Sequence, residues 1–119
     1  MAPSWSAVVV DYQSGPLLVS CVRSLLADDS AGRPPEVVVV DNAGAANDPA
    51  ALSSSAVLVS SSAVLAADFP DVPVIRPGAN LGYARAANLG IAATRAPVVA
   101  VLNPDTEIEP GTAAALVAR

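Results

Sequence analysis

An amide and a carboxylate, Asn103 and Asp105, follow directly after the apolar run Val98–Leu102. An apolar run that stops so abruptly predicts a buried strand with polar groups at its carboxyl end. In open α/β sheets, ligands bind at the edge where the strands end. Carboxylate oxygens are preferred ligands of hard cations such as Mg²⁺. Asp105, followed by Thr106 and Glu107, is therefore a candidate binding residue for a divalent cation and a phosphorylated ligand. The alternative is a residue that only stabilises the turn.

Polar residues also follow the other predicted strands. In chain order, the strand ends carry Asp11 with Tyr12 and Gln13, Asp41 with Asn42, Arg76, and Asn103 with Asp105. The starts of the strands show no such pattern. Because the carboxyl ends of parallel strands meet at one edge, this pattern favours a binding edge over the general polarity of loops.

Short Val-rich runs alternate with helical patterns along the chain. Strands are predicted at 6–10, 37–40, 72–75 and 98–102, and helices at 16–26, 48–68, 83–95 and 111–119. Such alternation predicts an α/β domain whose parallel sheet is buried on both faces by helices. The helix at 48–68 is the weakest of these predictions. It contains SSSAVL twice, seven residues apart, and the same letters would also alternate as a strand.

The composition excludes several classes of chemistry. The 119 residues are 53% hydrophobic and 14% charged, which predicts one folded domain. The net charge is −5, so the chain lacks the basic surface that nucleic acid or anionic lipid would require. It has no His, and all six basic residues are Arg. Histidine catalysis, lysine Schiff bases and the P-loop lysine are therefore absent from this sequence.

The single cysteine and the hydropathy pattern bear on the compartment. Cys21 lies on an apolar helical stripe with Leu17 and Leu25, which predicts a buried, unreactive thiol. One cysteine cannot form an internal disulfide, and this favours a reducing compartment, the cytoplasm. No apolar run approaches the roughly 18 residues that a membrane span needs.

The ordered motifs of the chain resemble a known family. They are VVVDYQSG, VRSLL, PPEVVVVDNAG, VPVIRPGANLGYARAANLGI and APVVAVLNPDTEIEPG. In this order and spacing they resemble the N-terminal, donor-binding half of family 2 glycosyltransferases, nearest the rhamnosyltransferase-like branch. The resemblance covers residues 1–119 as one domain. It implies a Rossmann-like GT-A fold with four parallel strands in the spatial order 3-2-1-4, flanked by helices. A dinucleotide-binding or receiver domain fits less well, because GxGxxG and Lys are absent.

The resemblance assigns the residues that would contact the nucleotide. Tyr12 and Gln13 stand where the family lines the nucleotide base, although most members have Asn in place of Gln13. Asp41 matches the carboxylate that accepts an N–H of the base. Asn42, its neighbour, is interpreted as a turn residue.

The resemblance assigns the diphosphate side of the site as well. Asn80 and Gly82 match a turn that passes under the donor, and Asn80 would either bind the ligand or cap the turn. Arg85 would offset diphosphate charge or remain a solvated surface residue. Asn103 and Asp105 stand where the family has its Asp-x-Asp signature, so Asp105 would bind Mg²⁺ or Mn²⁺ together with the donor.

The resemblance implies an inverting transfer of a sugar from a nucleotide diphosphate sugar to an acceptor hydroxyl. It suggests rhamnose, a thymidine or uridine nucleotide, and cell-envelope polysaccharide synthesis, at the inner membrane face in a full-length relative. Family members continue beyond the metal signature into the acceptor half with the catalytic base. We therefore assign no catalytic residue and expect a truncated donor-binding half. It would self-associate through the edge of the strand at 98–102. The alternative is a non-catalytic nucleotide-binding or assembly module.

Overall fold

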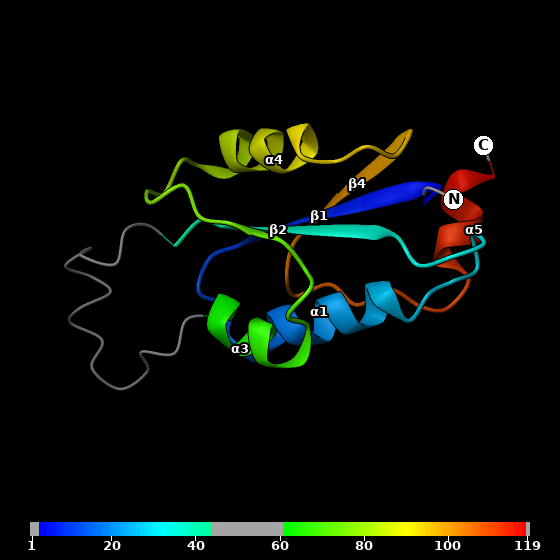
Figure 1. The fold of residues 1–119 in the computed structure, drawn as a ribbon, viewed down its shortest axis with the longest axis horizontal. Helices are drawn as coiled ribbons and strands as arrows, with labels where there is room; N and C mark the ends of the chain where they lie inside the picture. The colour runs from blue at the N-terminus through cyan, green and yellow to red at the C-terminus, as the bar shows by residue number, and fades with distance from the viewer. Residues whose placement is uncertain (1–2, 44–60, 119) are drawn as a thin grey trace.

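The computed structural model describes residues 3–43 and 61–118, and its centre is a four-stranded parallel sheet. The strands are β1 (Trp5–Asp11), β2 (Glu36–Asp41), β3 (Val74–Ile75) and β4 (Val98–Leu102). Their spatial order is β3-β2-β1-β4, which confirms the predicted topology (Figure 1). The register sets Val8 beside Val38 on one side and Val101 on the other. Asp11 and Asp41 are likewise direct neighbours at the carboxyl edge.

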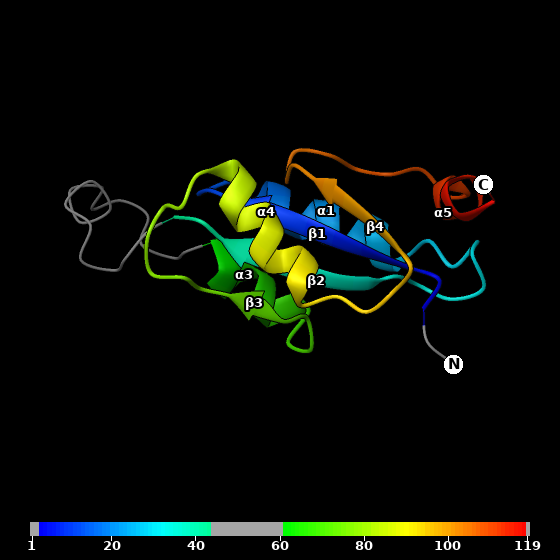
Figure 2. The ribbon, with the colours of Figure 1, turned by 90° about the horizontal axis from the view of Figure 1, so that it is seen from above.

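Four described helices surround the sheet: α1 (Pro16–Leu26), α3 (Ser61–Asp68), α4 (Tyr83–Ala92) and α5 (Thr112–Val117). Figure 1 shows α1 and α3 on one face and α4 on the other, and Figure 2 shows α5 beyond the amino ends of the strands. Each helix between two strands runs opposite to them, so the first turns of α1, α3 and α4 lie at the carboxyl edge. This edge is the one that the sequence marks with polar residues.

Two apolar layers fix the helices to the sheet. The larger lies under α1 and α3, and its buried residues include Trp5, Leu18, Leu25, Val39 and Leu65. The smaller lies under α4, where Val8, Val10 and Val40 pack against Ala86 and Ala87. Because side chains alternate along a strand, β1 sends Val9 and Asp11 toward α1 and α3, and Val8 and Val10 toward α4.

Gly90 brings α4 close to the sheet. A Cβ atom at this position would overlap the Val8 side chain and lie 3.1 Å from Cγ2 of Val40. The helix backbone therefore packs directly on two valines of β1 and β2, with no room for a methyl group.

Several predicted boundaries differ from the structure. The fourth strand is half-buried along its whole length, not fully buried, because it is the edge strand of the sheet. The third strand has only two residues, Val74–Ile75, since Pro73 cannot donate to the ladder and Pro77 follows closely. The helix predicted at 83–95 ends at Ala92, and the one at 111–119 spans Thr112–Val117.

Other predictions fall partly on residues that are not described. Of the helix predicted at 48–68, the structure describes α3 at Ser61–Asp68, while the first SSSAVL copy lies outside the described residues. Within 3–43 and 61–118, no helix is long and apolar enough to cross a membrane. Self-association through the open edge of β4 stays a prediction.

Candidate functional site

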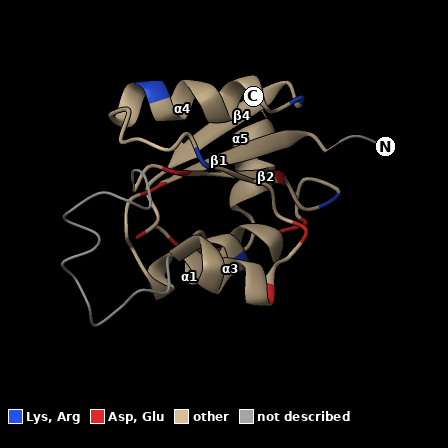
Figure 3. Cartoon of the chain, turned by 60° about the vertical axis from the view of Figure 1, so that its left-hand side comes forward, with Lys and Arg blue, Asp and Glu red and all other residues tan. Residues whose placement is uncertain are grey.

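An open cleft of about 530 Å³ lies at the carboxyl ends of β1, β2 and β4, beside the first turn of α4. Its lining comes from four segments that follow strands or begin a helix. The lining residues are Val10, Tyr12, Asn42, Asn80, Gly82, Tyr83, Asn103, Pro104 and Asp105. Three amides, two phenols and one carboxylate therefore face a single space. Figure 3 looks at this end of the sheet and shows acidic residues in its loops.

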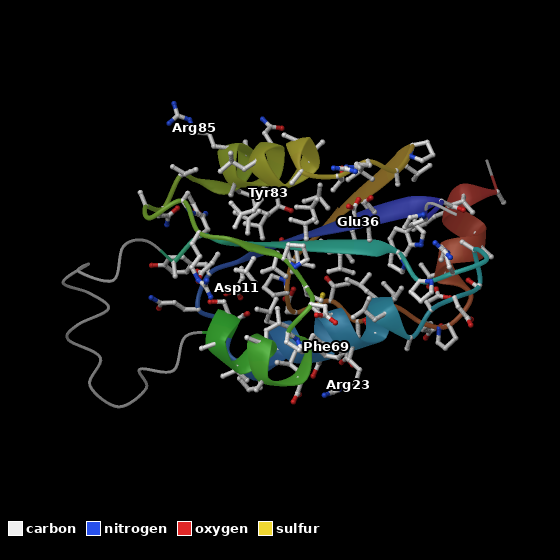
Figure 4. All side chains as sticks on the ribbon, in the orientation of Figure 1. Asp11, Arg23, Glu36, Phe69, Tyr83 and Arg85 are labelled. Atoms are coloured by element: carbon white, nitrogen blue, oxygen red, sulfur yellow. The ribbon has the colours of Figure 1, made fainter. Side chains whose placement is uncertain are left out.

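The cleft brings together five of the eight residues predicted for the site. They are Tyr12, Asn80, Gly82, Asn103 and Asp105. Gln13, Asp41 and Arg85 are not part of its lining. Gln13 is exposed and has a left-handed backbone, with φ 52°. Arg85 is exposed, and its side chain extends from α4 away from the sheet (Figure 4).

Asp41 lies on the opposite face of the sheet from the cleft, under the first turn of α3. Its Oδ1 accepts the N–H of Ala43 at 3.1 Å, and its Oδ2 accepts the hydroxyl of Ser62 at 2.9 Å. Arg76 donates to the Ser62 hydroxyl at 3.1 Å, and its Nε lies 4.0 Å from Asp41 Oδ2. The carboxylate is thus held by hydrogen bonds from two elements and has a cation beside it.

Asp11 is a buried carboxylate on the same face, next to Asp41. It is 1% exposed. Its Oδ1 accepts both the N–H and the hydroxyl of Ser14, whereas its Oδ2 has no hydrogen-bond partner among the described residues. Burial raises the pKa of Asp11, and the charge of Asp41 raises it further. The hydrogen bonds of Ser14 and the hydroxyl of Ser61 oppose this rise. The sequence places Asp11 at the edge but indicates no role for it.

The turn before α4 is held by two asparagines. Asn80 Oδ1 accepts the N–H of Gly82 at 2.9 Å, so Asn80 caps the turn. Gly82, with φ 82°, is the N-cap of α4 in a backbone conformation that favours glycine. Asn42 Oδ1 accepts the N–H of Leu81 at 2.9 Å, and its own N–H donates to Asp11 O at 2.7 Å. Asn42 therefore ties the ends of β1 and β2 to the start of α4.

Two lining residues with hydrogen-bonding side chains, Asn42 and Tyr83, were not predicted as site residues, and neither were the apolar Val10 and Pro104. Alternation along a strand sends Asp41 and Asn42 to opposite faces, and this signal could have identified Asn42 as the one facing the cleft. Tyr83 is the first residue of α4 and is 50% exposed. An aromatic residue directly after the helix-capping Gly82 was the available signal for it.

Asp105 lies on the exposed turn after β4. Thr106 N–H donates to Asn103 O at 3.1 Å and closes this turn. No group of three acidic, cysteine or histidine side chains that could hold a metal occurs in the described parts of the chain. Asp105 is thus a single carboxylate with the amide of Asn103 close by in the turn.

The predicted burial and low reactivity of Cys21 agree with the structure. The thiol is fully buried under β4, with its sulfur 3.9 Å from the carbonyl oxygen of Asn103. Burial, with the charges of Asp105 and Glu107, raises the pKa of Cys21 to about 11. The thiolate is therefore scarce at neutral pH.

The parallel β3-β2-β1-β4 sheet flanked by helices is the GT-A fold. The sequence profile of glycosyl transferase family 2 matches residues 6–119, and the chain belongs to this family. No curated protein matches the chain. The rhamnosyltransferase-like branch within the family stays a prediction.

Two solved structures are similar to this chain. TarS of S. aureus (residues 1–349) has a TM-score of 0.65 at 20% identity, over 99% of this chain and 32% of that one. The mannosyltransferase PcManGT from Pyrobaculum calidifontis, in complex with GDP-Man and Mn²⁺, has a TM-score of 0.66 at 21% identity, over 98% and 31%. At these identities the likeness is one of fold. The chain spans about a third of the length of either structure.

Proposed function

We propose that this chain binds the nucleotide diphosphate sugar of a family 2 glycosyltransferase in the cleft at the carboxyl edge. The observation that carries the proposal is the convergence of Tyr12, Asn80, Asn103 and Asp105, from three separate segments, on one space. Family membership supports the same ligand class. In the full reaction an acceptor hydroxyl attacks the anomeric carbon, and the nucleoside diphosphate leaves.

The cleft fits a divalent cation only when the donor shares it. Mg²⁺ requires about six oxygen ligands, and Asp105 with the Asn103 amide supplies one or two. The remaining ligands would be diphosphate and water oxygens. A bound cation would offset the negative charge that grows on the leaving diphosphate. The structure of PcManGT with GDP-Man and Mn²⁺ supports this part of the proposal.

The narrower proposal concerns the donor and its use. The donor would be a thymidine or uridine diphosphate sugar, with rhamnose as the first candidate. Because Asp41 lies outside the cleft lining, the base of this donor would have to reach across the carboxyl edge of the sheet to present an imide N–H to it. Each carboxylate oxygen can accept two hydrogen bonds, so Asp41 retains capacity beyond Ala43 and Ser62. Transfer into cell-envelope polysaccharide, in the cytoplasm at the inner membrane face, belongs to this same proposal.

Calorimetric titration with UDP, TDP and GDP, with and without Mn²⁺, tests the proposal. Asp105→Ala should lower the affinity for these nucleotides about tenfold or more when Mn²⁺ is present, and should leave it unchanged when Mn²⁺ is absent. Asp41→Ala should weaken UDP and TDP whether or not metal is present. Glu107→Ala is the control, because this exposed carboxylate lies two residues beyond Asp105 and outside the cleft lining. Unchanged affinities in both test variants would show that the site is misplaced.

A further inference from the structure

Both tyrosines of the chain line the cleft at the carboxyl edge. The aromatic residues of the sequence are one Trp, one Phe and two Tyr. Tyr12 follows β1 and Tyr83 begins α4, and their side chains are 52% and 50% exposed. A ring left half exposed gives up much of the stabilisation that its burial would provide. Trp5, by contrast, is buried in the core under α1. This distribution indicates that the two tyrosines serve the cleft and not the core.

The direction of the Tyr83 side chain follows from its place on α4. Tyr83 lies three, four and seven residues before Ala86, Ala87 and Gly90, so all four share one face of the helix. The three later residues are buried against the sheet. Tyr83 belongs to the first turn, at the carboxyl edge, and its ring therefore meets the cleft where the strands have ended. Figure 4 shows Tyr83 on the sheet side of the helix, whereas Arg85 extends away.

Asp105 decides which part of a donor would reach Tyr83. It is the charged residue among the described lining residues, so a divalent cation and the diphosphate that shares it belong beside this carboxylate. In the proposed function the base lies toward the ends of β1 and β2. The sugar is bonded to the diphosphate on the side away from the nucleoside. It would therefore lie next to the cation, in the space that Tyr83 shares with Asn103 and Asp105.

We propose that the ring of Tyr83 is the surface on which the sugar of the donor packs, through the C–H face of the sugar ring. The face of an aromatic ring carries partial negative charge, and the C–H groups of a sugar carry partial positive charge, so the two attract each other. The inference rests on the proposed function for the identity of the ligand as a nucleotide diphosphate sugar. It adds the residue that contacts the sugar and not the nucleotide.

Calorimetric titration tests the inference by comparing each nucleoside diphosphate with a sugar derivative of it. The pairs are TDP with TDP-rhamnose, UDP with UDP-glucose and GDP with GDP-mannose, all with Mn²⁺ present. At least one sugar derivative should bind the unaltered chain more tightly than its diphosphate. Tyr83→Ala should weaken the binding of that derivative about fivefold or more, and should leave the affinity for the diphosphate within about twofold. Tyr83→Phe keeps the ring and should retain the affinity for the sugar derivative.

Two further variants serve as controls. Leu89→Ala shortens a 39% exposed apolar side chain of the same helix outside the cleft lining, and it should change neither affinity by more than about twofold. Tyr12→Ala should weaken the diphosphate and its sugar derivative by the same factor, because its proposed contact is with the base. An equal loss for both ligands in Tyr83→Ala would assign Tyr83 to the nucleotide and would overturn the inference.

A second measurement covers the case in which Tyr83→Ala fails to fold. With two tyrosines in the chain, Tyr12→Phe and Tyr83→Phe assign the ring signals in proton NMR spectra. Nuclear Overhauser effects in the unaltered chain should join the Tyr83 ring to C–H protons of the bound sugar, and the Tyr12 ring to the nucleoside. A Tyr83 ring without contacts to the sugar would overturn the inference.

The same titrations separate this inference from the proposed function. If neither the diphosphates nor their sugar derivatives bind, the proposed function fails and the inference fails with it. If the diphosphates bind with a dependence on Asp105, but the sugar adds no affinity that depends on Tyr83, the proposed function stands and the inference alone fails.

Discussion

Two buried aspartates at opposite ends of the molecule, Asp11 and Asp28, differ in how many donors reach their carboxylates. Asp28 follows α1 and is 2% exposed. Its oxygens accept the backbone N–H groups of Ser30 at 3.1 Å, Gly111 at 3.3 Å and Ala113 at 2.9 Å. Hydrogen bonds from Ser30, Ala113 and Gly111 together lower the pKa of Asp28 to about 2. Asp28 thus caps α5 from a distant part of the chain.

Asp11 is as deeply buried but has fewer donors. Ser14 donates to one of its oxygens, and the other has no hydrogen-bond partner among the described residues, although the nearby hydroxyl of Ser61 helps to lower the pKa. Burial raises the pKa of Asp11. At Asp11 burial outweighs the hydrogen bonds, whereas at Asp28 the hydrogen bonds outweigh burial, and this balance sets the direction in which each pKa moves. Asp28, which has more donors, lies near the amino ends of the strands, where it holds α5. Asp11, which has fewer, lies at the carboxyl edge beside the candidate site.

Removal of the Asp28 carboxylate should have the largest effect. Asp28→Ala leaves three N–H groups without their acceptor: that of the buried Ala113 and those of the exposed Ser30 and Gly111. The loss should cost about 3 kcal/mol of unfolding free energy. Urea denaturation would measure the loss, and hydrogen exchange at Ala113 should accelerate with it. Asp29→Ala, at the exposed neighbouring position, is the control and should change stability by less than about 0.5 kcal/mol.

Acid should reverse the stabilising effect of Asp28. Because its folded pKa lies below its ordinary value of 3.8, its stabilisation is present above about pH 4 and is lost as the pH falls toward about 2. The contribution is about 2 kcal/mol. Denaturation curves across this pH range should show that the unfolding free energy of Asp28→Asn falls less on acidification than that of the unaltered chain. An equal loss in both proteins would assign the acid sensitivity to other groups.

The fold could be predicted from the sequence because its determinants are local. Val37–Val40 and Val98–Leu102 are apolar runs with polar ends, and their alternation with helices restricts the topology. The apolar run of β4, taken alone, overestimated its burial, since edge position depends on which strands pair, and the order 3-2-1-4 came from the family resemblance. The short β3 was overestimated for a related reason: Val72 and Pro73 are apolar, yet they form no ladder pairs.

The site was only partly predictable, because the face that a side chain occupies depends on register. Asp41 and Arg85 were predicted as site residues from their positions in the family motifs. In the structure the Asp41 side chain lies on the α3 face of the sheet, because side chains alternate along a strand, and Arg85 lies on the outer surface of α4. Asn42 was interpreted as a turn residue, and it does hold a turn. Its side chain also lines the cleft, which its position after the strand did not reveal without the register.

Asp11→Asn should have a smaller effect of the opposite sign. Because the folded pKa of Asp11 is raised, the ionised group opposes folding at neutral pH, and this penalty disappears as the pH falls toward 3.8. Asn keeps the oxygen that accepts from Ser14 and removes the charge. We expect unchanged stability or a gain of up to about 1 kcal/mol at pH 7. Chemical denaturation of Asp11→Asn and Asp28→Asn side by side would measure this change. If Asp11→Asn lost as much unfolding free energy as Asp28→Asn, the two carboxylates would not differ as described.

An exposed aspartate completes the comparison with the smallest effect. Asp68 pairs with Arg23 at 3.1 Å, and both side chains are at least half exposed. Exposed ion pairs are screened by water and salt, so Asp68→Ala should cost less than about 0.5 kcal/mol. The difference in unfolding free energy between Asp68→Ala and the unaltered chain should vanish in about 0.5 M NaCl, where charges are screened within a few ångströms. A cost above that of Asp28→Ala would overturn the ranking by donor number.

The close packing of Gly90 on Val8 and Val40 has a consequence for the cleft. Gly90 lies seven residues, about two helical turns, after Tyr83 on the same helix. A methyl group there would force α4 away from the sheet, and a short rigid helix that lifts at one point also tilts at its first turn. The glycine thus acts as a spacer that sets the distance between Tyr83 and the loop after β4. A Gly90→Ala variant should therefore bind the proposed nucleotide diphosphate sugar more weakly, although every residue that lines the cleft is intact.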